Sequence, residues 1–247
     1  MGRVALSHQF TGPTSGYGSD RVQANVVILP KDYAYDFLLF CVRNQKSCPL
    51  IEVTDVGSPY CSGGDIDLRM DIPRYRVFQH GTFTDEPLDI KDYWQNDFVG
   101  FLIGCSFTFE HALITGGIPM KHIQQGKNVA MYVSNIECSQ AGMFSGKTVV
   151  SMRPIHQSQV ELAVEITAKY PHTHGAPIHI GHPKLIGIED IYRPDFGDNI
   201  TIEPSEIPVF WACGVTPQVV CLNGKPEIMI THAPGHMLIT NYLIKDF

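Results

Sequence analysis

The stretch EIPVFWACGVTPQ, Glu206–Gln218, joins a strand pattern to a helix pattern through a cysteine and a glycine. Ile207–Ala212 is an apolar run of the kind that forms a buried strand. It ends at Cys213–Gly214, and Thr216–Pro217 then favours the start of a helix. In open α/β sheets, ligands bind at the carboxyl ends of strands, where the following helix presents free N–H groups. The stretch therefore predicts a strand-to-helix junction that binds a ligand.

The residue types at this junction favour an anionic ligand. Thr216 is suited to the N-cap and Pro217 to the first helical position, while Gly214 permits a tight turn or the close approach of a ligand. The helix dipole would attract a carboxylate and lower the pKa of the Cys213 thiol. We therefore predict that Gly214, Thr216 and Gln218 bind substrate, and that Cys213 is either a catalytic thiol or a small buried residue.

The composition is that of an ordinary globular protein. Of 247 residues, 44% are hydrophobic and 17% are charged, and the formal charge is −7 with scattered basic residues. A nucleic-acid partner is not expected, because such proteins carry a basic face. No apolar run is long enough to span a membrane, and MGRVALSHQF lacks the apolar core of a secretory signal, so we expect a cytoplasmic protein without a membrane partner. Seven cysteines without a C-x-x-C pair argue against a disulfide framework or a zinc ribbon.

Strand and helix patterns alternate in the first part of the chain. Val22–Pro30 predicts a strand, Lys31–Gln45 a helix and Pro49–Asp55 a second strand, an order typical of a parallel pair with a crossover helix. The long apolar stretch Asp97–Gly117 predicts two consecutive helices, or one helix interrupted at Gly104.

The change of pattern further along the chain predicts two domains. We expect a layered, Rossmann-like α/β domain formed by residues 1–117 and 204–247. A smaller α+β domain with two layers, residues 118–203, is expected to be inserted into it. The amphipathic pattern Gln157–Tyr170 predicts a helix within the inserted domain.

The motif ITHAPGHM, Ile230–Met237, places His232 and His236 on either side of Pro234–Gly235. These two residues break the single helix face on which metalloenzymes place histidines four positions apart. We expect a turn after a strand end instead. A neutral histidine there would be a general base, or else a hydrogen-bonded structural residue.

Three further residues are candidates for binding an anion. Arg153 ends the strand-like segment VSMRP, and its planar fork is suited to a carboxylate, although a surface ion pair would also account for it. Thr14 and Ser15 lie in the loop TGPTSG, whose hydroxyl and N–H groups can form an anion nest. Four histidines cluster in YPHTHGAPIHIGHP, but no acid or cysteine completes a ligand set there, so no metal is predicted.

Eight ordered blocks of the sequence carry a resemblance: FTGPTSG, VQANVVILP, FLIGCSFTFE, VSMRP, HGAPIHIG, PDFGD, PVFWACGVTPQ and ITHAPGHM. Between Phe10 and Thr240, they are similar to the hydro-lyase family that includes D-glutamate cyclase. The resemblance implies a two-part α/β fold and a dehydration. In the characterised branch, D-glutamate loses water between its amine and its γ-carboxylate to give 5-oxo-D-proline, without a redox cofactor or a metal.

The reaction that the resemblance implies suggests roles for the predicted residues. Two carboxylates must be held, an ammonium proton removed and an oxyanion stabilised. The helix start at Thr216 would receive one carboxylate or the oxyanion, and Arg153 or the Thr14–Ser15 loop would hold the other. His232 or His236 would transfer protons. The expected partner is a small carboxylate substrate; the oligomeric state stays open, and a homo-oligomer is compatible with the sequence.

Two other functions stay open. A cysteine-dependent amidohydrolase or racemase would use Cys213 or Cys105 as nucleophile or base, and alkylation would inactivate it. A non-catalytic protein that binds an amino acid or keto acid would be stabilised by its ligand without converting it.

Overall fold

This computed structural model describes residues 10–18, 20–61 and 65–246. Strand β1 (Arg21–Pro30) lies inside the larger of its two main antiparallel sheets. Its β-branched residues favour an extended chain, and every residue after Arg21 is buried. Within the described ranges the larger sheet has seven strands: β1, β2 (Leu50–Val53), β5 (Tyr75–Gln79), β6 (Thr82–Asp85), β7 (Phe98–Gly104), β12 (Ile228–His232) and β13 (Leu238–Leu243).

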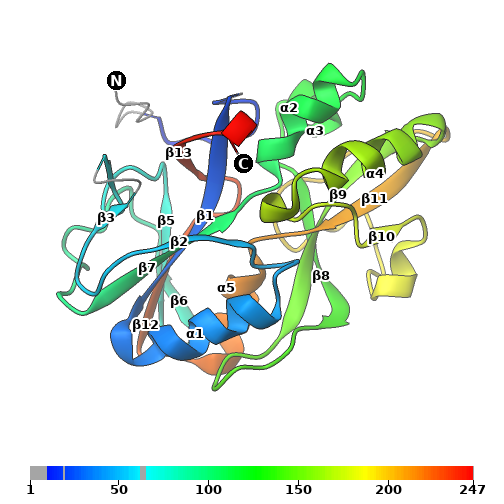
Figure 1. The fold of residues 1–247 in the computed structure, drawn as a ribbon. Helices are drawn as coiled ribbons and strands as arrows, with labels where there is room; N and C mark the ends of the chain where they lie inside the picture. Colours follow the sequence, from blue (N-terminus) through cyan, green and yellow to red (C-terminus); the bar gives the residue numbers. More distant parts are fainter. Residues whose placement is uncertain (1–9, 19, 62–64, 247) are drawn as a thin grey trace.

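The remaining elements form a smaller sheet, a short hairpin and the helices. The smaller sheet contains β8 (Ala130–Glu137), β9 (Lys147–His156), β10 (His179–Ile180) and β11 (Glu206–Ala212), and the hairpin contains β3 (Tyr60–Cys61) and β4 (Ile66–Asp67). The helices are α1 (Lys31–Arg43), α2 (Phe107–Thr115), α3 (Lys121–Gln124), α4 (Val160–Ala168) and α5 (Thr216–Gly224), with 3₁₀ turns η2 (Gln157–Gln159), η3 (Pro171–Thr173), η4 (Pro183–Ile186) and η5 (Ile244–Asp246). In the part of the chain that is described, no helix has the length and apolar character needed to cross a bilayer. Figure 1 shows α1 and α5 below the larger sheet and α4 beside the smaller one.

The expected Rossmann-like α/β layer is wrong, because the strand pairs of both sheets are antiparallel and the fold is mixed α+β. The larger sheet has the order β2-β7-β1-β12-β5-β6, with β13 also paired to β1. β1 and β2 run in the same direction, as a crossover helix predicts, but β7 lies between them and pairs antiparallel with both. A local β-α-β pattern does not reveal which later strand will enter between its two strands.

The stretch Asp97–Gly117, expected to be helical, is a strand followed by a helix. Phe98–Gly104 forms β7, in which every residue is buried, and α2 begins at Phe107. A central strand covered on both faces is apolar without alternation, so its sequence resembles that of a buried helix. Glycine is needed at Gly104 because a Cβ atom would lie 1.9 Å from the carbonyl oxygen of His172.

The strand of the opening stretch, β11, belongs to the smaller sheet. It pairs antiparallel with β9 and with β10. Helix α2 follows β7 of the larger sheet but packs on the smaller one, where Phe109 lies in one apolar cluster with Ala163 of α4 and Trp211 of β11. α2 therefore connects the two sheets. The division of the chain at residues 118–203 stays a prediction.

Strands β12 and β13 pair with the same edge of β1, one after the other, and the segment between them leaves that edge. Thr231 of β12 lies opposite Val27, and Leu238 of β13 lies opposite Ala24. Residues 25–26 of β1 therefore face the longer segment His232–Met237, whose additional residues must leave the sheet. We call His232–Met237 the bulge.

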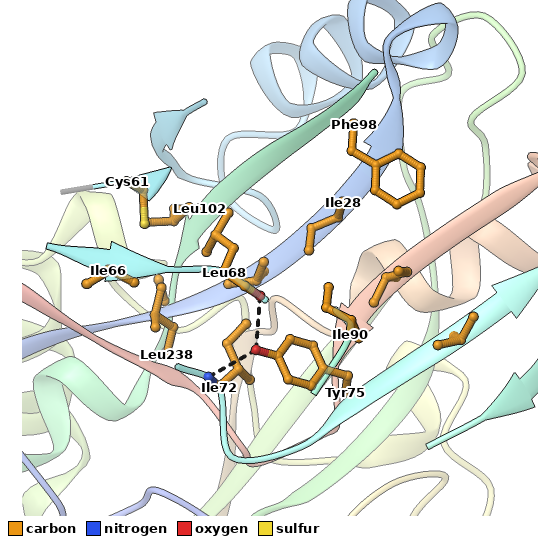
Figure 2. Close-up of a cluster of buried hydrophobic side chains, with 14 of the residues drawn as sticks. Ile28, Cys61, Ile66, Leu68, Ile72, Tyr75, Ile90, Phe98, Leu102 and Leu238 are labelled. Atoms are coloured by element: carbon orange, nitrogen blue, oxygen red, sulfur yellow. Dashed lines mark hydrogen bonds between the residues drawn. The ribbon is translucent and has the colours of Figure 1, made fainter. Parts of the chain in front are cut away.

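Both faces of the larger sheet are covered by apolar side chains. Figure 2 shows one cluster, in which Ile28 and Leu102 pack in the same core as Tyr75. The Tyr75 hydroxyl donates to the Leu68 carbonyl at 2.9 Å and accepts from the Ile72 N–H at 3.2 Å. On the opposite face, residues of α1 and α5 form a second cluster with the alternate residues of β1.

We expect Tyr75→Phe to lower the free energy of unfolding by about 1–3 kcal/mol, because it leaves the buried Leu68 carbonyl and Ile72 N–H without this partner. Urea denaturation measures the change. Tyr35→Phe is the matched control, because Tyr35 is 73% exposed. Equal stability of Tyr75→Phe and the wild type would show that this core does not depend on the two hydrogen bonds.

Candidate active site

The bulge buries the imidazole of His232 where the strand line is interrupted. The Val26 N–H donates to Nδ1 at 3.1 Å, a shorter distance than the 3.3 Å from Nδ1 to the Val26 carbonyl oxygen. We therefore assign the proton of the neutral ring to Nε2, which has no hydrogen-bond partner among the described residues. Burial lowers the pKa of His232 to about 4, although the Val26 carbonyl acts against it. At neutral pH His232 is an uncharged hydrogen-bond donor.

His236 lies at the other end of the bulge and is half-buried. Its Nδ1 is 3.0 Å from the Pro234 carbonyl oxygen. Burial lowers the pKa of His236, whereas the carbonyl groups of Pro234 and Thr11 favour the charged ring. The charge of Arg74 lowers the same pKa and that of Glu86 raises it. A neutral ring with acceptors in place for its protonated form is suited to take up and release a proton.

The bulge is held from two sides. On one side, Nδ2 of Asn128 donates to the Pro234 carbonyl at 3.1 Å. Glycine is needed at Gly235, because its φ is +84° and a Cβ atom there would lie 2.4 Å from Nδ2 of Asn128. On the other side, the Thr14 N–H donates to the Gly235 carbonyl at 2.8 Å. The Thr14 hydroxyl accepts from the Met237 N–H at 3.0 Å. Thr14, predicted to bind substrate, is thus fully buried and fixes the bulge.

Two arginines that the sequence analysis missed lie beside the bulge. Arg74 and Arg76 share one carboxylate, that of Glu86, at 3.4 and 3.0 Å. Arg76 also donates to Gln218 Oε1 at 3.4 Å, and Gln218 Nε2 donates to the His232 carbonyl at 3.0 Å. The pair carries one positive charge more than its acid, and its side chains are 34% and 28% exposed. The alternation Arg-Tyr-Arg could have revealed the pair, because residues two apart in a strand share a face.

A second polar group is buried where α2 meets the smaller sheet. Nε and Nη2 of Arg153 lie 3.0 and 2.5 Å from Oε1 of Glu110. Nη2 also donates to the Ser106 hydroxyl at 3.0 Å, and Nη1 donates to the Ser151 hydroxyl at 3.1 Å. The side chains of Arg153 and Glu110 are 1% and 3% exposed. Arg153 therefore forms a buried ion pair, and its charge is already compensated.

Glu110 has two further partners. The Ser15 hydroxyl donates to Oε2 at 2.9 Å, and Nε2 of His122 lies 3.1 Å from Oε1. Burial by itself would raise the pKa of Glu110, but the charges of His122 and Arg153 outweigh it and hold the pKa at about 2. The sequence analysis missed Glu110, although a single acid inside the apolar helix sequence FTFEHALIT was a signal, since a buried acid requires a partner.

The loop at Thr14 and Ser15 connects the two groups. Thr14 holds the bulge, while the next residue, Ser15, bonds to Glu110. The structure therefore brings the predicted loop, Arg153 and the two histidines into one region. Their direct partners are protein groups, and the substrate-binding roles stay predictions.

Cys105 and Cys213 occupy matching positions between a strand and a helix. β7 leads through Cys105 to α2, β11 leads through Cys213 to α5, and both thiols belong to one apolar cluster. The Phe107 N–H donates to the Cys105 sulfur at 3.5 Å. The Val215 N–H donates to the Cys213 sulfur in the same way. Burial nevertheless raises both pKa values, that of Cys213 to about 11. The lowered pKa expected for Cys213 is wrong, because burial outweighs the Val215 N–H group and the charge of Arg153.

The start of α5 differs in detail from the predicted anion site. Thr216 is the first helical residue, and its hydroxyl donates to the Cys213 carbonyl at 2.6 Å and accepts from a backbone N–H of β9 at 3.1 Å. The N–H groups of Thr216 and Gln218 donate to carbonyl groups of the preceding turn. Gly214 has a structural role, because a Cβ atom there would lie 2.0 Å from the Asn25 side chain. An anion at this terminus stays a prediction.

Two side chains of the histidine-rich segment lie beside backbone carbonyl groups. His174 is buried with Nδ1 2.9 Å from the Lys46 carbonyl oxygen, and Nε2 of His179 lies 2.8 Å from the carbonyl oxygen of His182. Over residues 10–18, 20–61 and 65–246, no three His, Cys, Asp or Glu side chains are grouped as metal ligands.

A family model described as D-glutamate cyclase matches residues 99–241. The chain belongs to the D-glutamate cyclase family. The resemblance drawn from the eight sequence blocks is confirmed. The family match includes Glu110, Arg153, Cys213, His232 and His236 of the region just described.

Relatives extend the similarity over nearly the whole chain. A protein of Geobacillus kaustophilus is 57% identical over 241 residues, which are 97% of this chain and 92% of that protein. One of Thermoanaerobacter pseudethanolicus is 58% identical over 238 residues, 96% and 89% of the two chains. YcsI of Bacillus subtilis is 56% identical over 235 residues, 94% and 91%. All three bear the provisional name hydro-lyase, so by homology this chain is grouped with the carbon–oxygen lyases.

Replacing Glu110 with glutamine leaves the buried charge of Arg153 without its acid. We expect Glu110→Gln to lower the free energy of unfolding by about 3–5 kcal/mol near pH 7, and Glu110→Gln/Arg153→Met to recover part of that loss. Urea denaturation measures both. Glu189→Gln is the control, because the Glu189 side chain is 83% exposed, and it should change little. A wild-type stability for Glu110→Gln would contradict the structural role of the pair.

The same ion pair predicts an acid dependence. Because the pKa of Glu110 is lowered from 4.5 to about 2 in the folded protein, its contribution is present above pH 4.5 and is lost as the pH falls toward 2. The stability difference between wild type and Glu110→Gln should therefore shrink over that interval. A difference that stays constant down to pH 2 would argue against the lowered pKa.

His232 should be neutral near pH 7 with its proton on Nε2, because its pKa is lowered from 6.5 to about 4. Its contribution to stability is present above pH 6.5 and is lost as the pH falls toward 4. Two-dimensional ¹H–¹⁵N NMR of the ring nitrogens, assigned with His232→Gln, measures the tautomer and the titration midpoint. A proton on Nδ1, or a midpoint near 6.5, would contradict the assignment.

Proposed function

We propose that this protein cyclises D-glutamate to 5-oxo-D-proline with release of water. Family membership supports the reaction, and the bulge is the structural observation that fits it best. The amine nitrogen attacks the γ-carboxylate carbon, a C–N bond forms and a C–O bond breaks. The oxygen leaves as water with two protons from the substrate ammonium. The protein therefore has to hold the substrate in a folded conformation and relay protons, with no net proton uptake.

The arginine pair is the proposed anchor for the α-carboxylate of the substrate. Arg74 and Arg76 are partly exposed, and one carboxylate, that of Glu86, leaves them with a net positive charge. A guanidinium fork binds a carboxylate through two parallel hydrogen bonds. Arg153 is a less suitable anchor, because its N–H groups point to Glu110 and two serines. We assign Arg153 to positioning Glu110.

The two histidines are the proposed proton-transfer and oxyanion groups. His236 would accept a proton from the substrate ammonium and pass it to the departing oxygen. His232 would donate a hydrogen bond from Nε2 to the oxyanion formed at the former γ-carboxylate, since this donor is buried and has no partner within the described ranges. A charge on His236 lowers the pKa of His232, so the two rings are near enough to act on one substrate.

The other predicted residues would position these groups. Thr14 fixes the bulge, and Ser15 ties the same loop to Glu110. Gln218 holds Arg76 next to the main chain of His232. The reacting groups are thus proposed to be fixed before the substrate binds, which is the condition for efficient stabilisation of a transition state.

The direct test is chiral chromatography of 5-oxoproline after incubation of the purified protein with D-glutamate or L-glutamate. We expect 5-oxo-D-proline from D-glutamate at a rate proportional to protein concentration, and little product from L-glutamate. No product from either enantiomer would overturn the substrate while leaving the family intact. Thermal stabilisation by D-glutamate without turnover would favour the non-catalytic binding protein.

Variants test the assigned roles. His236→Gln should lower kcat by about 10²–10⁴-fold with little change in KM, because it removes the proton relay. Arg76→Met should raise KM by about tenfold, because it weakens the carboxylate anchor. His156→Gln is the matched control, since His156 is exposed and bonds to Ser158. A His236→Gln variant with wild-type kcat would exclude His236 as the relay.

The matching positions of Cys105 and Cys213 favour one alternative, a thiol-dependent racemase. One thiolate would remove the α-proton and the other thiol would return a proton to the opposite face. The cyclase proposal predicts that Cys105→Ala and Cys213→Ala both retain turnover, because burial keeps the thiols protonated. Loss of turnover in both variants, with deuterium exchange at the substrate Cα in D₂O by the wild type, would favour the racemase.

A further inference from the structure

A hollow of about 550 Å³ lies between α2 and the segment that follows β13. None of its lining residues belongs to the bulge, the arginine pair or the Arg153 ion pair. Its volume lies within the range of small-molecule sites, about 300–1,000 Å³. It is therefore a candidate ligand site distinct from the proposed active site.

Among the described residues that line this hollow, Lys245 carries a positive charge and Asp20 a negative one. Lys245 and His111 line it, both are exposed, and neither side chain forms an ion pair or a hydrogen bond with the residues described. The acid of the hollow, Asp20, lies 3.5 Å from Nε of Arg21. Asp20 is thus paired with Arg21, whereas the ammonium group of Lys245 forms no ion pair with the residues described.

The other walls of the hollow are largely apolar. Ala112 of α2 lies on one side, and Leu243 and Ile244 lie on the other. Tyr170, half-buried after the end of α4, adds an aromatic ring. Such walls favour a ligand with an apolar body, because its contact with them removes apolar surface from water.

We propose that this hollow binds a small organic anion with one carboxylate and an apolar body of one or two rings. Lys245 would pair with the carboxylate, and His111 would donate a ring N–H to it. The ring of Tyr170 and the side chain of Leu243 would contact the apolar body. One ammonium group suits a monocarboxylate better than a dicarboxylate such as glutamate. The ligand proposed for this hollow therefore differs from the substrate proposed for the arginine pair.

A smaller hollow of about 60 Å³ adjoins the first and shares Thr108, His111 and Ile244 with it. Glu110 lines the smaller hollow as an ionised carboxylate. The described residues that line the smaller hollow include no Lys or Arg, so the carboxylate of the ligand belongs on the Lys245 side. The ligand would then contact α2, the helix that also carries Glu110.

Isothermal titration calorimetry with 2-naphthoate tests the proposal, with uncharged 2-naphthamide as the comparison. We expect saturable binding of 2-naphthoate and weaker binding of the amide. Lys245→Met should weaken 2-naphthoate binding by about fivefold or more, because it removes the paired charge. Ala112→Phe, which fills the hollow, should weaken it similarly, and circular dichroism checks that the variant is folded. Lys184→Met is the control, at an exposed lysine paired with Glu189.

Absence of binding, or equal affinity for the acid and the amide, would overturn the proposal. Unchanged affinity in Lys245→Met would also overturn it, and this variant lies on the surface, where folding is not at risk. If D-glutamate displaces 2-naphthoate from both wild type and Lys245→Met, the anion binds at the arginine pair instead. None of these results depends on turnover, so the cyclase proposal is tested separately.

Discussion

The buried ion pair between Arg153 and Glu110 is the interaction on which the rest of the structure depends. It joins α2, which continues from the larger sheet, to β9 of the smaller sheet. Removal of two charges from water is costly, and the hydrogen bonds of both groups offset that cost. Phe109 and Trp211 enclose the guanidinium at 5.4 Å. Since Ser15 also bonds to Glu110, the position of the N-terminal loop follows from the same charge pair.

The bulge is the second constraint, and it explains why a histidine is fully buried. The imidazole of His232 accepts from the Val26 N–H, which faces the interrupted strand line. A side chain thus satisfies a backbone donor that the sheet leaves without a strand partner. Thr14 and Asn128, both distant in the sequence, then hold the segment in place. The candidate site is assembled around a break in the sheet, with its donors fixed by the surrounding packing.

Local structure could largely be predicted from the sequence. The strand predicted at Val22–Pro30, the helix predicted at Lys31–Gln45 and the strand-to-helix junction after Ala212 all appear, and the helix ends at Arg43. Periodicity and the Thr-Pro pair carry this local information. β7 could not be predicted, because Phe98–Gly104 is apolar on both faces and has the pattern of a buried helix. The sheet type was also wrong, since a β-α-β order does not exclude an antiparallel strand between its two strands.

The sequence by itself determined the family, the positions of most strands and helices, and the segments that meet in the candidate site: the Thr14 loop, Arg153 and ITHAPGH. Only the tertiary structure decided what these residues contact. Glu110 neutralises Arg153, burial keeps Cys213 protonated, and Arg74 and Arg76 supply the accessible positive charge. The reason is physical: local patterns follow from neighbours in the chain, whereas charge compensation and desolvation depend on groups that folding brings together from distant positions.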